Sequence, residues 1–286
     1  MGAGNAMTNK PKDAPNLGEL RKEIDRIDET MHRLLMERGE IINRLITVKD
    51  SQESGSAFRP AREADMMRRL VQRHHGILPL DTAESIWRVI IATFTHVQAP
   101  FSVHADLSAS DAMMRDSARF HFGFTVPFVP HTSAPGVVQA VSASKGDLGL
   151  VPAFATAHGG AWWTALESAG APKIIARLPF IDRPDHPAPL NVFVVSRASA
   201  DAMVTEVETW SVRVAGWGRE AALSASALAE IIAVPDSASD GAALLISVPA
   251  GGSLTQIKDA VVKAGATVRS AALVGSHATR YKVPAK

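Results

Sequence analysis

A run of apolar residues spaced three and four apart constrains the architecture of this chain more than any other feature. Its members are Leu17, Leu20, Ile24, Ile27, Met31, Leu34, Ile41, Leu45 and Val48. This heptad spacing gives a helix one apolar seam. It predicts a helix over residues 17–50 that is about 50 Å long at about 1.5 Å per residue. A small helical domain is narrower than that, so we expect the helix to protrude and form an intertwined homodimer. A helical hairpin within one monomer is the alternative.

Charge density divides the chain into two parts. Residues 17–100 hold 13 Lys+Arg and 13 Asp+Glu, whereas residues 101–286, more than twice as many, hold 15 of each. The dense part is typical of amphipathic helices and the sparse part of a protein built on a sheet. We expect a disordered leader over 1–16, a helical domain over 17–100 and an α/β domain over 101–286. Pro100 marks the boundary, because proline disfavours helix in the residue before it.

The helical domain is predicted to contain three helices. Pro60 suits the first turn of a second helix, and a third begins at Asp81, which can form a capping box with Glu84. Beyond Pro100, short β-branched runs alternate with helical stretches, which is typical of an α/β domain. The expected strands are 101–105, 125–129, 147–151, 173–178, 190–196, 211–215, 243–248 and 267–274. The expected helices are 108–121, 133–143, 159–169 and 253–264.

Composition excludes several classes of function. The chain has no cysteine, which rules out disulfides, thiolate catalysis and cysteine metal sites. A net charge of +1 provides no broad field for nucleic acid. No apolar run approaches the roughly 20 residues that span a bilayer. The histidines of the α/β part lack the spacing of a metal-binding helix. We therefore expect a soluble, cytoplasmic protein with no metal and no nucleic-acid or membrane partner.

Polar residues occupy positions where the predicted helical bundle would favour apolar ones. Arg38 stands in the apolar seam, and Lys49, 11 residues later, returns to within about 20° of the same face. Gln98 lies one turn after Phe94 and can also face the interior. Each of these residues alone can be structural, since a long cationic side chain can extend to solvent.

Further charged residues open the second predicted helix. Arg59, Arg62 and Glu63 lie where free backbone N–H groups attract anions. An Arg–Glu pair by itself is usually a solvated surface pair. Taken together with Arg38 and Lys49, however, these residues form a cationic interior that is costly unless an anion occupies it. The pattern favours a ligand with carboxylates or phosphates.

The local sequences around these positions carry a family resemblance. They are L-R-K-E-I-D-R-I-D with Arg21, M-E-R ending at Arg38, V-K ending at Lys49, F-R-P-A-R-E over 58–63, and I-W-R-V-I-I followed by V-Q at Gln98. Residues 17–100 resemble the all-helical chorismate mutase family, including its spacings of 17 and 11 residues between the first three cations. The resemblance implies an isomerase of phenylalanine and tyrosine biosynthesis in the shikimate pathway, which uses no cofactor.

The resemblance also implies a role for each polar position. Arg38 and the partner subunit's Arg21 would bind the substrate carboxylates. Lys49 would bridge a carboxylate and the ether oxygen, and Gln98 would donate to that oxygen. The expected catalytic residues are Lys49, Gln98 and Arg38, and the expected substrate-binding residues are Arg21, Arg38, Lys49, Arg59, Arg62, Glu63 and Gln98. Among these, Glu63 would accept a hydrogen bond from the ring hydroxyl of the substrate.

Residues 146–166 resemble a segment of prephenate dehydratase that contains Val-Pro-x-Glu-Asn-Ser. Here the segment reads Val-Pro-Ala-Phe-Ala-Thr over 151–156, without the Glu, Asn and Ser side chains. The resemblance therefore implies a degenerate dehydratase-like domain fused to the mutase. The alternatives are a bifunctional chorismate mutase/prephenate dehydratase, an isochorismate pyruvate lyase, and a non-catalytic regulatory protein that binds prephenate or an aromatic amino acid.

Overall fold

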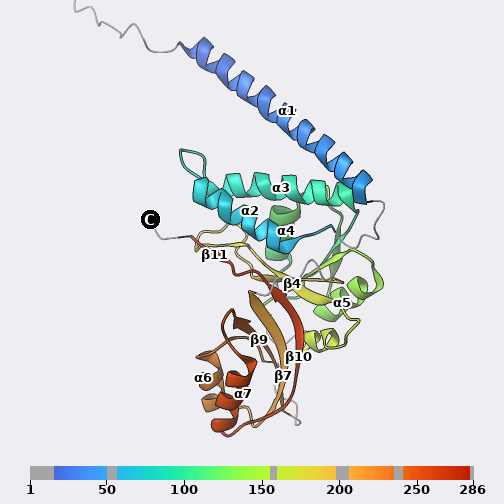
Figure 1. Ribbon diagram of the computed structural model, residues 1–286, viewed down its shortest axis with the longest axis vertical. Helices are drawn as coiled ribbons and strands as arrows, with labels where there is room; N and C mark the ends of the chain where they lie inside the picture. Colours follow the sequence, from blue (N-terminus) through green and yellow to red (C-terminus); the bar gives the residue numbers. More distant parts are fainter. Residues whose placement is uncertain (1–15, 50–56, 155–159, 198–205, 235–240, 284–286) are drawn as a thin grey trace, which may run out of the picture. The chain divides into compact units, whose positions relative to one another are not determined.

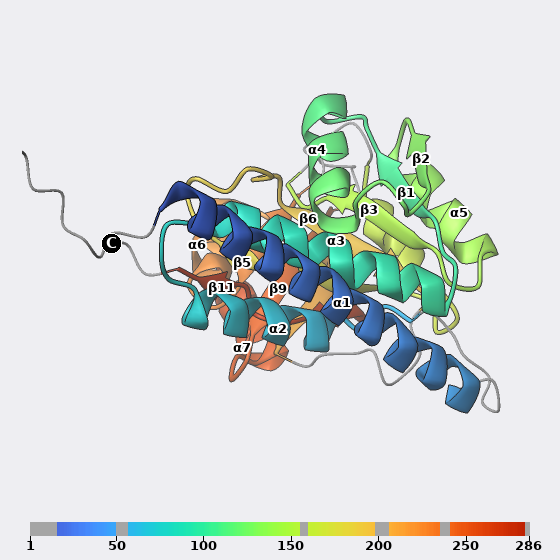
Figure 2. The ribbon, with the colours of Figure 1, turned by 90° about the horizontal axis from the view of Figure 1, so that it is seen from above.

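The computed structural model describes residues 16–49, 57–154, 160–197, 206–234 and 241–283. The chain forms two compact units, residues 1–52 and residues 53–286 (Figures 1 and 2). The leader expected over 1–16 lies outside the described residues, except for Asn16.

The first unit contains one described element, the helix α1 (Leu17–Lys49). The Asn16 side chain accepts hydrogen bonds from the backbone N–H groups of Gly18 and Glu19, at 2.7 and 3.1 Å. The Glu19 carboxylate in turn accepts from the Asn16 N–H at 3.1 Å. This reciprocal capping box satisfies N–H groups that have no partner within the helix, which explains why α1 begins at Leu17.

The apolar seam of α1 is exposed along its whole length. Its nine residues are between 36% and 70% exposed, from Leu45 at the low end to Val48 at the high end. Among the described residues of the first unit, no second element is present to cover them. A helix of this kind gains most of its stability from packing its apolar face, so the seam requires a partner outside this unit.

The second unit opens with α2 (Pro60–Arg73) and α3 (Leu80–Gln98). Pro60 occupies the first turn of α2, as predicted. The capping box expected at the start of α3 is wrong, because Pro79 is the N-cap and no side chain caps the helix. Glu84 is fully buried and contacts His186 Nε2 at 3.2 Å, so its carboxylate points into the interior and away from the helix end.

The rest of the second unit is an α/β structure, as predicted. Its first part contains β1 (Val103–Asp106), α4 (Asp111–Phe122), β2 (Phe128–His131), α5 (Ala134–Ala143), β3 (Leu148–Pro152), the 3₁₀ helix η1 (Trp162–Leu166), β4 (Lys173–Leu178), β5 (Ile181–Asp182) and β6 (Val192–Ser196). Its second part contains β7 (Val207–Ala215), α6 (Arg219–Ser226), β8 (Glu230–Ala233), β9 (Ala242–Pro249), α7 (Leu254–Lys263), β10 (Thr267–His277) and β11 (Tyr281–Lys282).

One nine-stranded sheet runs through both parts, in the order β2-β1-β3-β6-β4-β10-β7-β9-β8. Strands β2, β1 and β3 are parallel, and β6 is antiparallel to both β3 and β4. Strand β10 pairs in parallel with β4 through Gly275 and Ile174. Gly275 has a φ of +156°, and a side chain there would lie 2.1 Å from the Ile174 carbonyl oxygen, so this approach requires glycine.

Strands β7 to β10 form a β-α-β-β-α-β unit with the order β10-β7-β9-β8. Helices α6 and α7 lie on the same side of these strands (Figure 1). They cover a core that includes Val212, Leu244, Ile246, Val248 and Ile257. The opposite face of these four strands is therefore free of α6 and α7.

Helices α2 and α3 share a hydrophobic core with the α/β part. Met67 of α2 and Ile91 of α3 pack in one cluster with Phe122 of α4 and with Leu148 and Ile175 of the sheet. The hydrophobic core therefore includes residues on both sides of the predicted boundary at Pro100. The domain boundaries inferred from composition remain predictions.

Strands β5 and β11 were not expected from the sequence, and two longer stretches of the α/β part also differ from the expectation. The helix expected over 159–169 is only the short η1 among the described residues. Between Gly216 and Gly241, where no element was expected, the structure has α6 and β8.

Candidate active site

Three of the predicted site residues lie on α1. Arg21 and Arg38 are separated by 17 residues of unbroken helix, or about 25 Å along its axis at about 1.5 Å per residue. Lys49 is the last residue of α1, about 16 Å beyond Arg38 by the same measure. A single ring-sized ligand therefore cannot contact both Arg21 and Arg38 of the same chain. Arg21 is exposed, and Arg38 is half-buried.

The other four predicted residues lie in the second unit, and three of them open α2. Arg59 is the N-cap of the helix, and its Nη1 donates to the Phe58 carbonyl at 3.2 Å. Arg62 is exposed, whereas Glu63 is buried. The first turn of α2 thus brings these three residues together, with the two arginines nearer the surface.

Glu63 is held by a buried ion pair. Its Oε2 accepts from Arg88 Nη1 of α3 at 2.7 Å, and Arg88 is completely buried. Arg88 Nη2 donates to the His121 carbonyl of α4 at 3.2 Å. Burial raises the pKa of the Glu63 carboxyl, and the Arg88 guanidinium opposes that shift. Arg88 of α3 therefore contacts α2 through the Glu63 carboxylate and α4 through the His121 carbonyl.

Arg88 belongs to a buried polar cluster that the sequence reasoning did not identify. The cluster consists of Glu63, Glu84, Arg88, His121 and His186. His121 and His186 stack with ring centroids 6.1 Å apart. Burial, followed by the charge of Arg88, holds the pKa of His121 well below its usual value. The only sequence signal was an arginine in the apolar run I-W-R-V-I-I.

Gln98, the last residue of α3, is half-buried. Its Nε2 donates to the Phe94 carbonyl, one turn earlier, at 3.0 Å. A side-chain amide has two N–H donors, so this bond uses only one of them. The amide is thus fixed by its own helix and retains a second donor.

The helical part of the chain also matches a known family. Residues 20–99 match the family model of chorismate mutase type II. This region of the chain is therefore similar to chorismate mutase type II. All seven predicted site residues fall within it, and the part of the chain from Pro100 onward lies outside it.

Three similar proteins are bifunctional chorismate mutase/prephenate dehydratases. The protein of Aquifex aeolicus is 31% identical over 147 residues, which is 50% of this chain and 40% of that protein. The protein of Pseudomonas aeruginosa is 28% identical over 144 residues, 49% of this chain and 39% of that protein. That of Neisseria gonorrhoeae is 29% identical over 103 residues, 36% of this chain and 27% of that protein. No solved structure gave a significant match.

The matched region of this chain thus spans about two fifths of the length of the first two relatives. The matches of 144 and 147 residues are longer than the 80-residue mutase region, so they extend into the α/β part. This similarity to proteins named for both activities agrees with the predicted fusion.

The segment of the α/β part that resembles prephenate dehydratase is largely apolar in the structure. All five residues of β3 are buried, and Ala153 after it is 2% exposed. The Phe154 ring lies 5.2 Å from the guanidinium carbon of Arg177. Among residues 146–154, Asp147, which lies before β3, is the only side chain with a carboxylate, amide or hydroxyl group. Among the other described residues of the segment, 160–166, Thr164 has a hydroxyl, which donates to the Ala161 carbonyl at 2.8 Å.

Two features are absent from the described residues. None of their helices is long and apolar enough to cross a membrane. No group of three or more His, Asp or Glu side chains among them is arranged to hold a metal ion.

Proposed function

We propose that this protein is a chorismate mutase, which converts chorismate to prephenate in phenylalanine and tyrosine biosynthesis. The observation that carries the proposal is the match of residues 20–99 to chorismate mutase type II. The polar residues at the positions expected to bind a dicarboxylate support it, namely Arg21, Arg38 and Lys49 on α1 and Gln98 at the end of α3.

The proposed reaction is a Claisen rearrangement within one molecule. The ether C–O bond breaks while a new C–C bond forms, and no proton enters or leaves. The protein therefore needs no general base, nucleophile or cofactor. It must hold the reactive conformer of the substrate and stabilise the negative charge that develops on the ether oxygen.

Each polar residue has a role in this proposal. Arg38 and the partner subunit's Arg21 bind the two carboxylates, and Lys49 bridges one carboxylate and the ether oxygen. Gln98 donates its second N–H to the ether oxygen while its first remains bonded to the Phe94 carbonyl. Arg59 and Arg62 line the substrate side of α2, and Glu63 accepts from the ring hydroxyl. Because Glu63 is already paired with Arg88, it would have to use its second carboxylate oxygen.

A homodimer is part of the same proposal. The roughly 25 Å between Arg21 and Arg38 on one helix requires one of the two arginines to come from another chain. The exposed apolar seam of α1 supports such a pairing, because a second copy would cover it. We also infer a cytoplasmic location. A chain without cysteine has no disulfides that the reducing cytoplasm could break.

We infer that the α/β part has lost dehydratase chemistry. A specific observation nevertheless favours the bifunctional reading as second candidate, since the similar proteins are named for both activities and the similarity extends past the mutase region. Against it stands the apolar character of β3 and of the residues that follow it.

Incubation of the purified full chain with chorismate tests both candidates. Loss of the diene absorbance of chorismate would be followed together with the products by NMR. Prephenate as sole product is expected. Phenylpyruvate would establish the bifunctional reading instead. If chorismate is not converted, the proposal is overturned, and release of pyruvate from isochorismate would then identify a lyase.

A further inference from the structure

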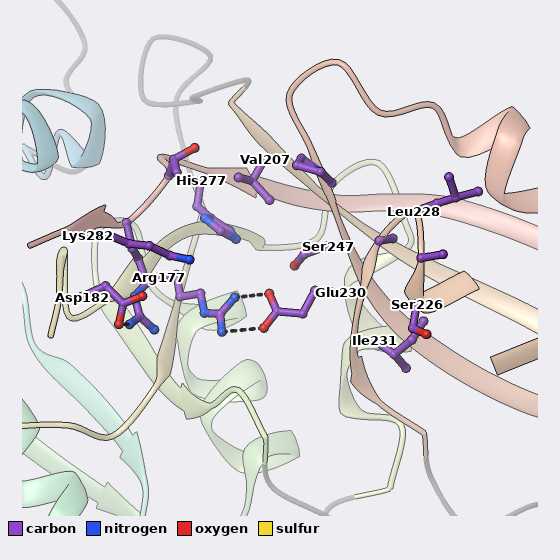
Figure 3. Close-up of a pocket in the computed structure, with 15 residues that line it drawn as sticks. Arg177, Asp182, Val207, Ser226, Leu228, Glu230, Ile231, Ser247, His277 and Lys282 are labelled. Atoms are coloured by element: carbon purple, nitrogen blue, oxygen red, sulfur yellow. Dashed lines mark hydrogen bonds and ion pairs between the residues drawn. The ribbon is translucent and has the colours of Figure 1, made fainter. Parts of the chain in front are cut away.

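A large cavity lies in the second unit, among the strands at one end of the sheet (Figure 3). Its volume is about 780 Å³, and its walls come from β4, β8, β9, β10 and the segments next to them. Cavities of this size commonly hold small organic molecules. None of the residues proposed for the mutase reaction lines it. We refer to it as the Arg177 cavity.

The floor of the Arg177 cavity is the sheet face opposite α6 and α7. Glu230 of β8 pairs directly with Ser247 of β9, so their side chains share a face. His277 of β10 pairs with Val207, which pairs with Pro249, two residues from Ser247. Since side chains alternate along a strand, His277 lies on this same face. The His277 ring and the Ser247 hydroxyl both point toward Glu230 (Figure 3).

Charged groups of both signs line the cavity, with cations in excess. Arg177 forms a two-point ion pair with Glu230, at 2.6 and 3.0 Å. Arg280 pairs with Asp182. Lys282, which is exposed, adds a third cation to the lining. Three cations against two carboxylates leave a net charge of +1, which favours a ligand with one negative charge.

Four buried polar atoms of the cavity-lining residues have no hydrogen-bond partner among the residues described here: His277 Nε2, Ser247 Oγ, Arg177 Nε and Arg280 Nε. His277 and Ser247 are each only 2% exposed. Leaving such atoms unsatisfied is costly, and native structures seldom do so without a reason. The floor of the cavity therefore offers hydrogen-bonding capacity that a bound molecule could use.

The protonation of His277 specifies what kind of group it can receive. Burial lowers its pKa to about 4, so the ring is neutral at pH 7. Its Nδ1 lies 2.9 Å from the Ala278 carbonyl, an acceptor, so Nδ1 carries the proton. Nε2 is then an acceptor and requires a donor on the ligand. An anion without an O–H or N–H group, such as sulfate, has no proton to give it.

We propose that the Arg177 cavity is a second ligand site, which binds a ring-sized monocarboxylate bearing hydroxyl groups. The carboxylate lies toward Lys282 and Arg280, where positive charge is in excess. A hydroxyl group donates to His277 Nε2, and another exchanges a hydrogen bond with Ser247. This site is separate from the proposed mutase residues and does not depend on them.

Calorimetric titration of the full chain with three small molecules tests the proposed chemistry. Quinate has a six-membered ring, one carboxylate and several hydroxyls, and it is expected to bind. Cyclohexanecarboxylate lacks the hydroxyls, and inositol lacks the carboxylate, so each is expected to bind at least about tenfold more weakly because it forfeits one set of polar contacts. No measurable quinate binding up to 10 mM, or equal binding of all three molecules, overturns the proposal.

A matched pair of variants locates the binding. Ser247→Ala removes a hydroxyl from the cavity floor and should weaken quinate binding about fivefold or more. Ser276→Ala removes an equally buried hydroxyl from β10 that does not line the cavity, so quinate affinity should stay within about twofold. Comparable melting temperatures of the two variants would confirm that both fold.

Chorismate turnover distinguishes binding in the Arg177 cavity from binding at the mutase residues. The Ser247→Ala variant should turn over chorismate at the wild-type rate. Quinate binding that survives Ser247→Ala but disappears in Arg38→Ala would show that quinate occupies the mutase residues, which overturns the second site. Absence of mutase activity in the wild-type chain would leave the binding result unaffected.

Discussion

Lys49 is the residue on which the proposed electrostatic catalysis depends most. We expect Lys49→Ala to lower kcat by about 100-fold or more, the usual effect of removing one preorganised donor to developing charge. Lys22→Ala is the matched control, because Lys22 is an exposed cation of the same helix with no proposed role, and its kcat should stay near wild type. Steady-state kinetics with chorismate measures both. Equal turnover in Lys49→Ala and wild type would contradict the assignment.

The neutral amide of Gln98 determines the pH dependence that we expect. An amide donates at any pH, so wild-type kcat should not rise on acidification through this position. In Gln98→Glu, the carboxyl group donates to the ether oxygen only when protonated, so kcat should fall as the pH rises through its pKa. Profiles of kcat against pH for the two proteins provide the measurement. A wild-type rate that climbs steeply as the pH falls is the contrary result.

At the scale of elements, Arg88 joins α2, α3 and α4 through buried hydrogen bonds. Arg88→Met would leave the Glu63 carboxylate buried without its counterion and should destabilise the fold by about 3–5 kcal/mol. Arg68→Met is the control, because Arg68 pairs with Asp65 on the exposed side of α2 and should cost at most about 1 kcal/mol. Denaturant unfolding gives both values. Adding Glu63→Gln to Arg88→Met should recover part of the loss.

The apolar seam of α1 predicts a second effect at this scale. Leu34→Asp places a charge in the seam and should convert the proposed dimer to monomer, with loss of mutase activity. Met36→Asp is the matched control for Leu34→Asp. Met36 is 55% exposed and Leu34 is 52% exposed, but Met36 lies outside the heptad positions. Sedimentation velocity measures the oligomeric state. If the Leu34→Asp variant stays dimeric, the seam is not the dimer interface.

Strong periodicity made some elements predictable from sequence and its absence hid others. The seam of α1 and the short apolar run I-I-A within β4 gave helix and strand bounds within one residue of the structure. Helix α6 was missed because A-A-L-S-A-S-A-L-A, over 221–229, has no clear period of either kind. Strand β8, which reads E-I-I-A, is too short to show a period. The last three residues of β10 include Gly275, which weakened the strand pattern.

The candidate site was predictable where charge interrupted a pattern, and hidden where pairing depends on distant residues. Arg38 is conspicuous in an apolar heptad, which a single helix can reveal. The partner of Glu63 is 25 residues away on another helix, so no local spacing indicated it. The Arg177 cavity depends likewise on strand order, because Arg177 and Glu230 are 53 residues apart and meet only through the sheet.

At the scale of the whole molecule, the origin of Arg21 can be tested by mixing inactive variants. Arg21→Ala and Arg38→Ala should each be inactive alone. After unfolding and refolding together, half of the dimers are mixed, and each mixed dimer regains one complete site. Activity should therefore return to about a quarter of the wild-type value. If Arg21 served its own chain, refolding the mixture would restore nothing.

The place of β10 in the sheet has a consequence for the order of assembly during synthesis. Strand β10 lies between β4 and β7, although it is made about 90 residues after β4 and 50 after β7. Until residues 267–277 leave the ribosome, β4 and β7 each keep one open edge, and such edges are templates for pairing with other chains. The sheet is therefore completed late in synthesis. Until then, a chaperone that covers the open edges of β4 and β7 would prevent their pairing with other chains.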